Sequence, residues 1–242
     1  MQSHRSPLPR EWLGHCIDSV KMWCAANCYE YQFIGDELFE DVPQSIMDKT
    51  HGQLTIASDL ARLLRLRELL KHHHRVVWCD ADFLIFNPNK FVLPQFKFAL
   101  GRKFWIQHKD GRENKLVSHT KVHNAFLMFE RDNVFLDFYI DAATRLVDLN
   151  TGTMSPQYIG PKFLTGIHNV AQCPVLETAG MLSPLVINAV EKGSGPALEL
   201  FRRRSPRPIA AANLCDSLCA SGELSPATIE RSIERLLHSG EV

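Results

Sequence analysis

The chain has 242 residues, of which 45% are hydrophobic and 22% charged, so its length and composition are those of a globular protein with a sizeable core. Its 27 lysines and arginines balance its 27 aspartates and glutamates, which argues against a protein that binds nucleic acid through its overall charge. The sequence has no long apolar run and no signal-peptide pattern, and its seven cysteines are scattered and odd in number. We therefore expect a soluble, cytoplasmic protein with reduced thiols.

The first part of the chain predicts helices that alternate with strands. Apolar residues at helical spacing predict a helix over residues 12–26. A clearer helix covers residues 58–74, with Ser58 or Asp59 as its N-cap and leucines along one face. The apolar run 76–86 follows directly and predicts a buried strand. A helix followed by such a strand is typical of an α/β sheet.

The second part of the chain continues this alternation. The expected elements are two strands around a loop at Gly101, a strand over 123–131, a helix over 133–149, a short helix from Gly160 or Pro161, and a final helix from Ser225 or Pro226. Residues 193–208 are rich in glycine, serine, proline and arginine, so we expect an irregular segment there. Too little sequence follows this segment to fold alone, so residues 1–242 are expected to form a single domain.

Two aspartates, Asp80 and Asp82, lie two residues apart at the expected carboxyl end of the apolar strand. If the strand continues through them, both side chains point to the same face. Two carboxylates at short range repel one another and lose hydration, so a cation is expected to neutralise them. Mg²⁺ and Mn²⁺ prefer such oxygen ligands and often share them with substrate phosphates. An exposed polar turn without an ion is the alternative interpretation.

The order of helix, apolar strand and D-x-D resembles the nucleotide-sugar-binding core of GT-A glycosyltransferases. The stretch from Ala57 to Arg62 is similar to the A-S-D-x-x-R motif of the retaining group, which includes bacterial lipopolysaccharide sugar transferases, initiating mannosyltransferases and glucosylating clostridial toxins. HNAFLMF, from His123, resembles the strand that follows D-x-D in these enzymes, and GPKFLTG, from Gly160, resembles their G-P-x-x-[LF]-T loop. The likeness is strongest over residues 55–170.

The resemblance implies an α/β fold of the GT-A type, a Rossmann-like mixed sheet flanked by helices. Such folds open with a strand whose end contacts the nucleotide base, whereas this chain reaches its first helix by about residue 12. The N-terminal strand is therefore expected to be truncated: either it is missing from this sequence, or residues 1–3 are its last remnant.

The resemblance also implies an activity, which is transfer of a sugar from a nucleoside-diphosphate sugar to a hydroxyl of a saccharide or other acceptor, with retention of configuration. Asp80 and Asp82 would hold Mn²⁺ or Mg²⁺ across the diphosphate, and Asn124 would bind hydroxyls of the donor or acceptor. The residues expected to contact the nucleotide sugar are Ser58, Asp59, Arg62, Asp80, Lys162 and Ser217.

A third metal ligand in this group is often a histidine from the C-terminal region. Here the segment AAANLCDSL offers Asn213 as the expected ligand, with Asp216 as an alternative and His168 as a competing choice. An asparagine oxygen is neutral and is a weaker ligand than a carboxylate.

Two other functions remain open at this level. One is a GT-A domain that binds a nucleotide sugar or a partner without turnover, which the short N-terminus favours. The other is a phosphohydrolase with an aspartate nucleophile, which is disfavoured because Phe83, Leu84 and Ile85 follow the motif where a small residue is usual. No nucleic-acid partner is expected, and without a transmembrane segment any membrane association would be peripheral.

Overall fold

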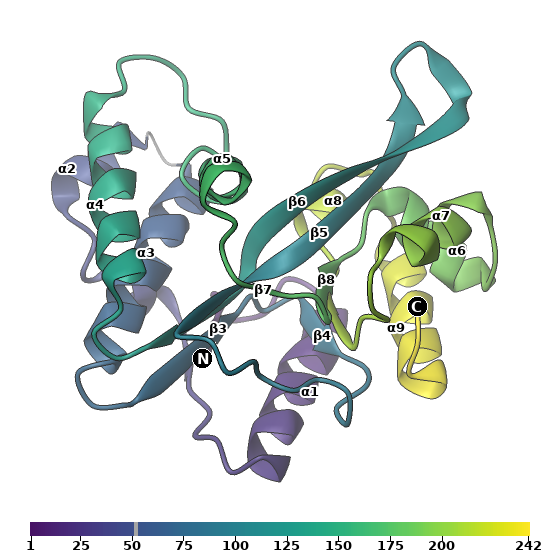
Figure 1. Ribbon diagram of the computed structural model, residues 1–242, viewed down its shortest axis with the longest axis horizontal. Coiled ribbons are helices and arrows are strands. Elements are labelled where there is room, and N and C mark those ends of the chain that lie inside the picture. The colour runs from purple at the N-terminus through teal and green to yellow at the C-terminus, as the bar shows by residue number, and fades with distance from the viewer. Residues whose placement is uncertain (51–52) are drawn as a thin grey trace.

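A computed structural model describes residues 1–50 and 53–242 of the chain. In this part of the chain the strands form three sheets, and helices pack around them (Figure 1). The expected α/β fold, with mixed sheets flanked by helices, is therefore confirmed. Across residues 1–50 and 53–242, none of the helices combines the length and the apolar character that a membrane crossing requires.

The strands are short except for one long hairpin. They are β1 (Gln2–Ser3), β2 (Phe33–Ile34), β3 (Arg75–Cys79), β4 (Phe83–Ile85), β5 (Phe98–Lys109), β6 (Arg112–Glu130), β7 (Val175–Leu176), β8 (Ala179–Met181) and β9 (Ala211–Asn213). The central sheet has the order β3-β6-β5-β7, in which β6 is antiparallel to both neighbours and β7 is parallel to β5. A smaller sheet has the order β4-β9-β8, and β1 pairs with β2 in parallel.

The helices lie in groups around the central sheet. They are α1 (Trp12–Ala26), the 3₁₀ helix η1 (Asp36–Phe39), α2 (Gln44–Lys49), α3 (Leu54–Leu69), α4 (Val134–Leu149), α5 (Pro161–Ala171), α6 (Pro184–Lys192), α7 (Pro196–Arg204), α8 (Ser217–Ala220) and α9 (Pro226–Ser239). Figure 1 shows α2 to α5 on the left and α6 to α9 on the right, with the β5–β6 hairpin projecting between and beyond them. The end of β3 at Cys79 pairs with Phe126 in the interior of β6, and β4, which follows along the chain, pairs with β9.

The strand β1 lies beside β3. Gln2–Ser3 pairs with Phe33–Ile34. The amino group of Met1 donates to the carbonyl of Val77 at 2.9 Å, and the Met1 carbonyl accepts from the N–H of Cys79 at 3.0 Å. Residues 1–3 therefore link β2 to the strand that leads into the D-x-D motif.

The expected loop at Gly101 is absent from the described chain, because Phe98–Lys109 forms the single strand β5. The strand carries an irregularity between Leu100 and Gly101, where its register against β6 shifts. A Cβ atom at Gly101 would lie 2.2 Å from the ring of His123, so only glycine leaves room for that ring. Burial lowers the pKa of His123 to about 3, so the ring is neutral at physiological pH. The glycine marks a bulge and not a loop.

The start of α3 also differs from the prediction. The helix begins at Leu54, so Ser58 and Asp59 lie in its second turn and neither is the N-cap. The physical reason is that Ile56 and Ala57 are fully buried. The apolar stripe of the helix therefore extends one turn upstream of the polar pair that suggested a cap.

The prediction of an irregular segment over residues 193–208 is wrong, because Pro196–Arg204 forms α7. Proline at the first helical position is compatible with a helix, since its missing N–H has no partner there anyway. Ala197, Leu198 and Phe201 are buried, and the helix packs against the β5–β6 hairpin. This packing outweighs the polar, turn-like composition of the segment.

Candidate active site

The D-x-D motif lies in a turn between two strands. β3 ends at Cys79 and β4 begins at Phe83, and the N–H of Phe83 donates to the carbonyl of Asp80 at 3.0 Å. The expectation that one strand runs through both aspartates is therefore wrong. Because the backbone turns here, Asp80 and Asp82 are held by different parts of the chain.

Asp80 is held from the side of α3. Arg62 Nη1 donates to Asp80 Oδ1 at 2.9 Å, and the indole N–H of Trp78 donates to the same oxygen at 2.6 Å. The guanidinium carbon of Arg62 also lies 5.0 Å from the centroid of the Trp78 ring. Gln2 donates to the Asp80 carbonyl at 3.0 Å. Both side-chain hydrogen bonds fall on Oδ1, so within the described residues Oδ2 is left for another partner.

Arg62 is the centre of a buried cluster. Its Nη2 lies 3.2 Å from Asp59 Oδ1, its Nη1 donates to the Asn124 carbonyl at 3.1 Å, and its Nε donates to the Ser58 carbonyl at 3.2 Å. The amide of Asn124 donates to Asp59 Oδ1 at 2.7 Å. Burial works to lower the pKa of Arg62, but the charges of Asp80 and Asp59 raise it overall. The cluster therefore keeps one positive charge between two carboxylates.

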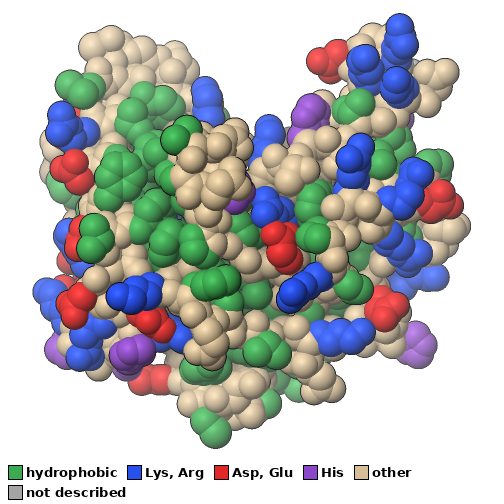
Figure 2. Space-filling view, in the orientation of Figure 1, with side chains coloured by type: hydrophobic (Ala, Val, Ile, Leu, Met, Phe, Trp, Pro, Cys, Tyr) green, Lys and Arg blue, Asp and Glu red, His purple; other side chains and the backbone are tan. Residues whose placement is uncertain are grey.

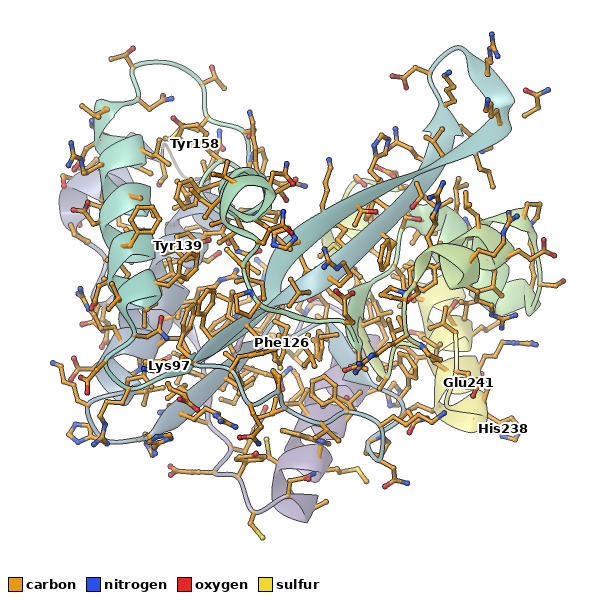
Figure 3. All side chains as sticks on the ribbon, in the orientation of Figure 1. Lys97, Phe126, Tyr139, Tyr158, His238 and Glu241 are labelled. Carbon is orange, nitrogen blue, oxygen red and sulfur yellow. The ribbon has the colours of Figure 1, made fainter. Side chains whose placement is uncertain are left out.

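Asp59 is the most enclosed carboxylate of the cluster. Its Oδ2 is buried with no hydrogen-bond partner among the described residues, and burial raises its pKa to about 6 against the opposing charge of Arg62. A Cβ atom at Gly160 would lie 2.2 Å from this oxygen. Tyr139, labelled in Figure 3, donates from α4 to the carbonyl of Ile159 at 2.9 Å and fixes the segment that leads to Gly160.

Asp82 is held from the side of β9 and α8. The amide nitrogen of Asn213 donates to Asp82 Oδ1 at 2.5 Å, and the backbone N–H of Asp216 donates to Oδ2 at 2.7 Å. The oxygen of the Asn213 amide accepts from the N–H of Cys215 at 2.9 Å. The carboxylate of Asp216 pairs with Arg10. Asn213 thus orients Asp82 with its nitrogen, and its role as a metal ligand stays a prediction.

The two carboxylates of the motif influence one another. Burial, together with the negative charge of Asp80, raises the pKa of Asp82 to about 7. The described residues contain no cluster of three or more His, Cys, Asp or Glu side chains that would enclose a metal by themselves. Two carboxylates, one with a free oxygen, nevertheless suit Mg²⁺ or Mn²⁺, which keep waters and take further ligands from a phosphate. The residues present fit such an ion.

The remaining predicted residues are placed differently. Ser217 is exposed at the start of α8, directly after the N–H that binds Asp82. Lys162 is exposed in the first turn of α5. His168 lies 3.5 Å from Arg102, which forms a two-fold hydrogen bond with Glu177. His168 therefore belongs to a separate cluster.

A groove of about 520 Å³ opens between α5 and the β5–β6 hairpin. Its Thr165 donates to the carbonyl of Val122 on β6, three residues before Ala125, whose carbonyl accepts from the N–H of Asp80. Figure 2 shows the surface hollowed between these elements, with basic side chains on both sides. The lining residues are Lys103, Lys121, Ser155, Pro156, Gln157, Pro161, Lys162 and Thr165. A negatively charged substrate is the natural occupant of such a groove.

Sequence reasoning did not find several of these residues. Trp78 precedes Asp80 by two residues, and this strand spacing was a usable signal for its hydrogen bond. Lys103 and Lys121 are neighbours only through the β5–β6 register, which no local motif announces. Gly160 was noticed as part of a loop motif, but its close approach to Asp59 is visible only in three dimensions.

Comparisons with known proteins add one likeness of structure. No protein-family model matches the chain, and no curated protein matches it. Among solved structures, the chain is similar to a glycosyltransferase involved in the glycosylation of the major capsid of PBCV-1, with 12% sequence identity and a TM-score of 0.49 over 97% of this chain and 96% of that chain.

Proposed function

We propose that this protein is a metal-dependent glycosyltransferase, which moves a sugar from a nucleoside-diphosphate sugar to a hydroxyl acceptor with retention of configuration. The observation that carries the proposal is the aspartate turn. Asp80 is anchored by Arg62 and Asp82 by Asn213, and a groove lined by lysines opens beside them. Two fixed carboxylates next to a cationic groove form a binding site for a metal ion together with a diphosphate.

The roles of the residues follow from their contacts. Asp80 and Asp82 would hold Mn²⁺ or Mg²⁺, and the ion, when bound, would neutralise charge on the leaving diphosphate. Arg62 keeps Asp80 in place, and Asn213 does the same for Asp82. Such fixed partners reduce the reorganisation that binding requires.

The residues around this pair would contact the rest of the donor. The amide nitrogen of Asn124 donates to Asp59, which leaves the side-chain oxygen of Asn124 to accept from a sugar hydroxyl. Ser58, Lys162 and Ser217 are proposed to contact the nucleotide sugar. In the transfer itself, the bond between the anomeric carbon and the diphosphate oxygen breaks and a bond to the acceptor oxygen forms. The proton of the acceptor hydroxyl leaves with the diphosphate.

The test is a thermal-shift panel of UDP- and GDP-sugars with and without Mn²⁺. A ligand that binds only the native state raises its stability by about 2.7 kcal/mol at a hundred times the dissociation constant. We expect one nucleotide to shift the unfolding temperature only when Mn²⁺ is present. The shift should be lost in the Asp80→Asn/Asp82→Asn variant and kept in Asp141→Asn, which changes an exposed carboxylate on α4.

The outcomes separate the alternatives. If no nucleotide shifts the well-folded wild type, the proposed function is wrong. If a nucleotide binds but neither sugar transfer nor hydrolysis of the donor follows, the protein is a binding domain without turnover. Release of phosphate from a simple monoester would instead indicate a phosphohydrolase.

A further inference from the structure

The turn that follows β9 encloses Asp82 with three hydrogen bonds. The amide of Asn213 and the backbone N–H of Asp216 bind its two carboxylate oxygens. The N–H of Leu214 donates to the backbone carbonyl of Asp82 at 3.0 Å. Within the turn itself, the N–H of Cys215 donates to the side-chain oxygen of Asn213 at 2.9 Å. The position of Asp82 therefore depends on the shape of one four-residue turn.

Local structure alone is a weak support for the shape of this turn. Cys215 has a φ of 55°, in the left-handed region that residues other than glycine rarely adopt. Such a conformation persists only where the surrounding structure holds it in place. The helix that follows the turn, α8, has four residues, of which Leu218 is buried. A helix this short is marginal by itself, so the turn needs another anchor.

Arg10 supplies such an anchor from the segment before α1. Its Nη1 donates to Asp216 Oδ1 in an ion pair whose side chains are 21% and 24% exposed. The backbone of Arg10 is fixed in turn, because its carbonyl accepts from the N–H of Leu13 at 3.3 Å, and Trp12 and Leu13 are fully buried. The helix α1 also packs against β4, the strand that follows Asp82.

Asp216 links Arg10 to Asp82 because it uses two different groups. Its carboxylate accepts from Arg10, and its backbone N–H donates to Asp82 Oδ2 at 2.7 Å. The side chain of Asp216 makes no capping hydrogen bond to α8, so within the described residues the ion pair with Arg10 is what holds this side chain. Loss of Arg10 would therefore free the turn at the residue that contacts Asp82.

We propose that Arg10 is a positioning residue of the proposed metal site, which acts through Asp216 on Asp82. This inference rests on the proposed function, because it concerns the ion that Asp80 and Asp82 would hold. Loss of an outer partner that orients a metal ligand typically weakens metal binding by about 10–100-fold. Arg10 acts on Asp82 through another residue, so the lower end of this range applies.

The test is calorimetric titration of Mn²⁺ into the full chain in the presence of UDP and, separately, of GDP, with the unfolding temperature measured alongside. Arg10→Met removes the ion pair, whereas Arg10→Lys keeps the positive charge. Arg75→Met is the matched control. Arg75 pairs with Glu130 at a similar exposure, 20% and 19%, and lies at the end of β3 away from the D-x-D motif.

We expect Arg10→Met to bind Mn²⁺ about tenfold more weakly than wild type, while its unfolding temperature falls by less than about 3 °C. Arg10→Lys should recover most of the affinity, and Arg75→Met should bind Mn²⁺ within about twofold of wild type. Removal of Arg10 leaves more negative charge near the two carboxylates, which by itself favours a cation. Weaker binding would therefore be an effect of position and not of charge.

Asp216→Ala separates an anchor from a direct metal ligand. It keeps the backbone N–H, and the double variant Arg10→Met/Asp216→Ala should bind Mn²⁺ as Asp216→Ala does, because both changes break the same link. Unchanged binding in Arg10→Met would overturn the inference, and tighter binding would assign the Asp216 carboxylate to the ion instead. A large fall in unfolding temperature would make the ion pair a structural one and would also overturn it. A wild type that binds Mn²⁺ with neither nucleotide would overturn the proposed function itself.

Discussion

Replacing Arg62 by methionine removes the one positive charge inside the buried cluster. The guanidinium is 8% exposed, and it contacts Asp59, Asp80 and the carbonyls of Asn124 and Ser58. Methionine has a similar length but no donor. The variant therefore leaves two carboxylates side by side with no cation between them.

The expected loss of stability is large. Breaking a buried ion pair by removing one partner costs about 3–5 kcal/mol. The side chain of Asp59 is only 3% exposed, so the upper part of this range applies to it, whereas Asp80 is 26% exposed and regains some hydration. We expect Arg62→Met to lower the free energy of unfolding by about 3–5 kcal/mol near pH 8. Arg62→Lys keeps the charge but loses the planar geometry, so its loss should be smaller.

The loss should also depend on pH. Asp59 has a pKa of about 6 in the folded wild type, and removal of Arg62 raises it further because the opposing charge is gone. At a pH between the Asp59 pKa of the folded wild type and the Asp59 pKa of the folded variant, Asp59 is protonated only in the folded variant. The difference between variant and wild type should therefore shrink, by up to about 1.4 kcal/mol per pH unit, as the pH falls toward 6.

Urea unfolding with linear extrapolation, at about pH 8 and about pH 6, measures both effects. Circular dichroism is the appropriate signal, because Arg62 lies against the Trp78 ring and its replacement would itself alter the environment of that fluorophore. Arg145→Met, at an exposed position on α4, should keep wild-type stability. A loss below about 1 kcal/mol for Arg62→Met, or the same loss at both pH values, would refute the reasoning.

Three further substitutions test other parts of the structure. Gly160→Ala places a methyl group 2.2 Å from Asp59 Oδ2, so we expect a loss of about 1–3 kcal/mol in urea unfolding. Trp78→Phe removes the indole donor to Asp80, and calorimetry should show weaker Mn²⁺-dependent nucleotide binding. His123→Gln removes a ring whose pKa is about 3 when folded and 6.5 ordinarily. Between these pH values the unfolded state binds more protons than the folded state. The free energy of unfolding of the wild type therefore decreases as the pH is lowered below about 6.5, by up to about 1.4 kcal/mol per unit, and the variant should lack this decrease.

Each of these predictions has an outcome that would contradict it. Gly152→Ala adds a methyl group that meets nothing within 4 Å, so it should be nearly neutral, and equal losses at both glycines would contradict the steric argument. Nucleotide affinity that is unchanged in Trp78→Phe would show that the indole does not position Asp80. Parallel stability curves for His123→Gln and wild type would mean that the histidine is charged in the folded protein.

The sequence predicted best what local spacing determines. The helix over Trp12–Ala26 and the one that follows Asn133 are confirmed, because the apolar stripe of each lies within one segment and Asn133 caps the second. The aspartate motif was found for the same reason. The grouping of Asp59 and Arg62 also follows from three-residue spacing on a helix.

The remaining features depend on tertiary contacts. Gly101 suggested a loop because the His123 ring that fills its place comes from another strand. The composition of residues 193–208 did not predict α7, because the stability of this helix comes from its packing on the hairpin. Lys121 could not be assigned to the groove, because only the strand register brings it opposite Lys103.

The two aspartates of the turn have partners at very different places along the chain. Asp80 is held by Arg62, 18 residues before it, whereas Asp82 is held by Asn213 and Asp216, which follow it by 131 and 134 residues. During synthesis from the N-terminus, the chain can therefore set Asp80 long before the segment that sets Asp82 leaves the ribosome. In a nascent or C-terminally shortened chain only Asp80 would be held in place, so binding of the proposed ion would require the whole chain to have folded.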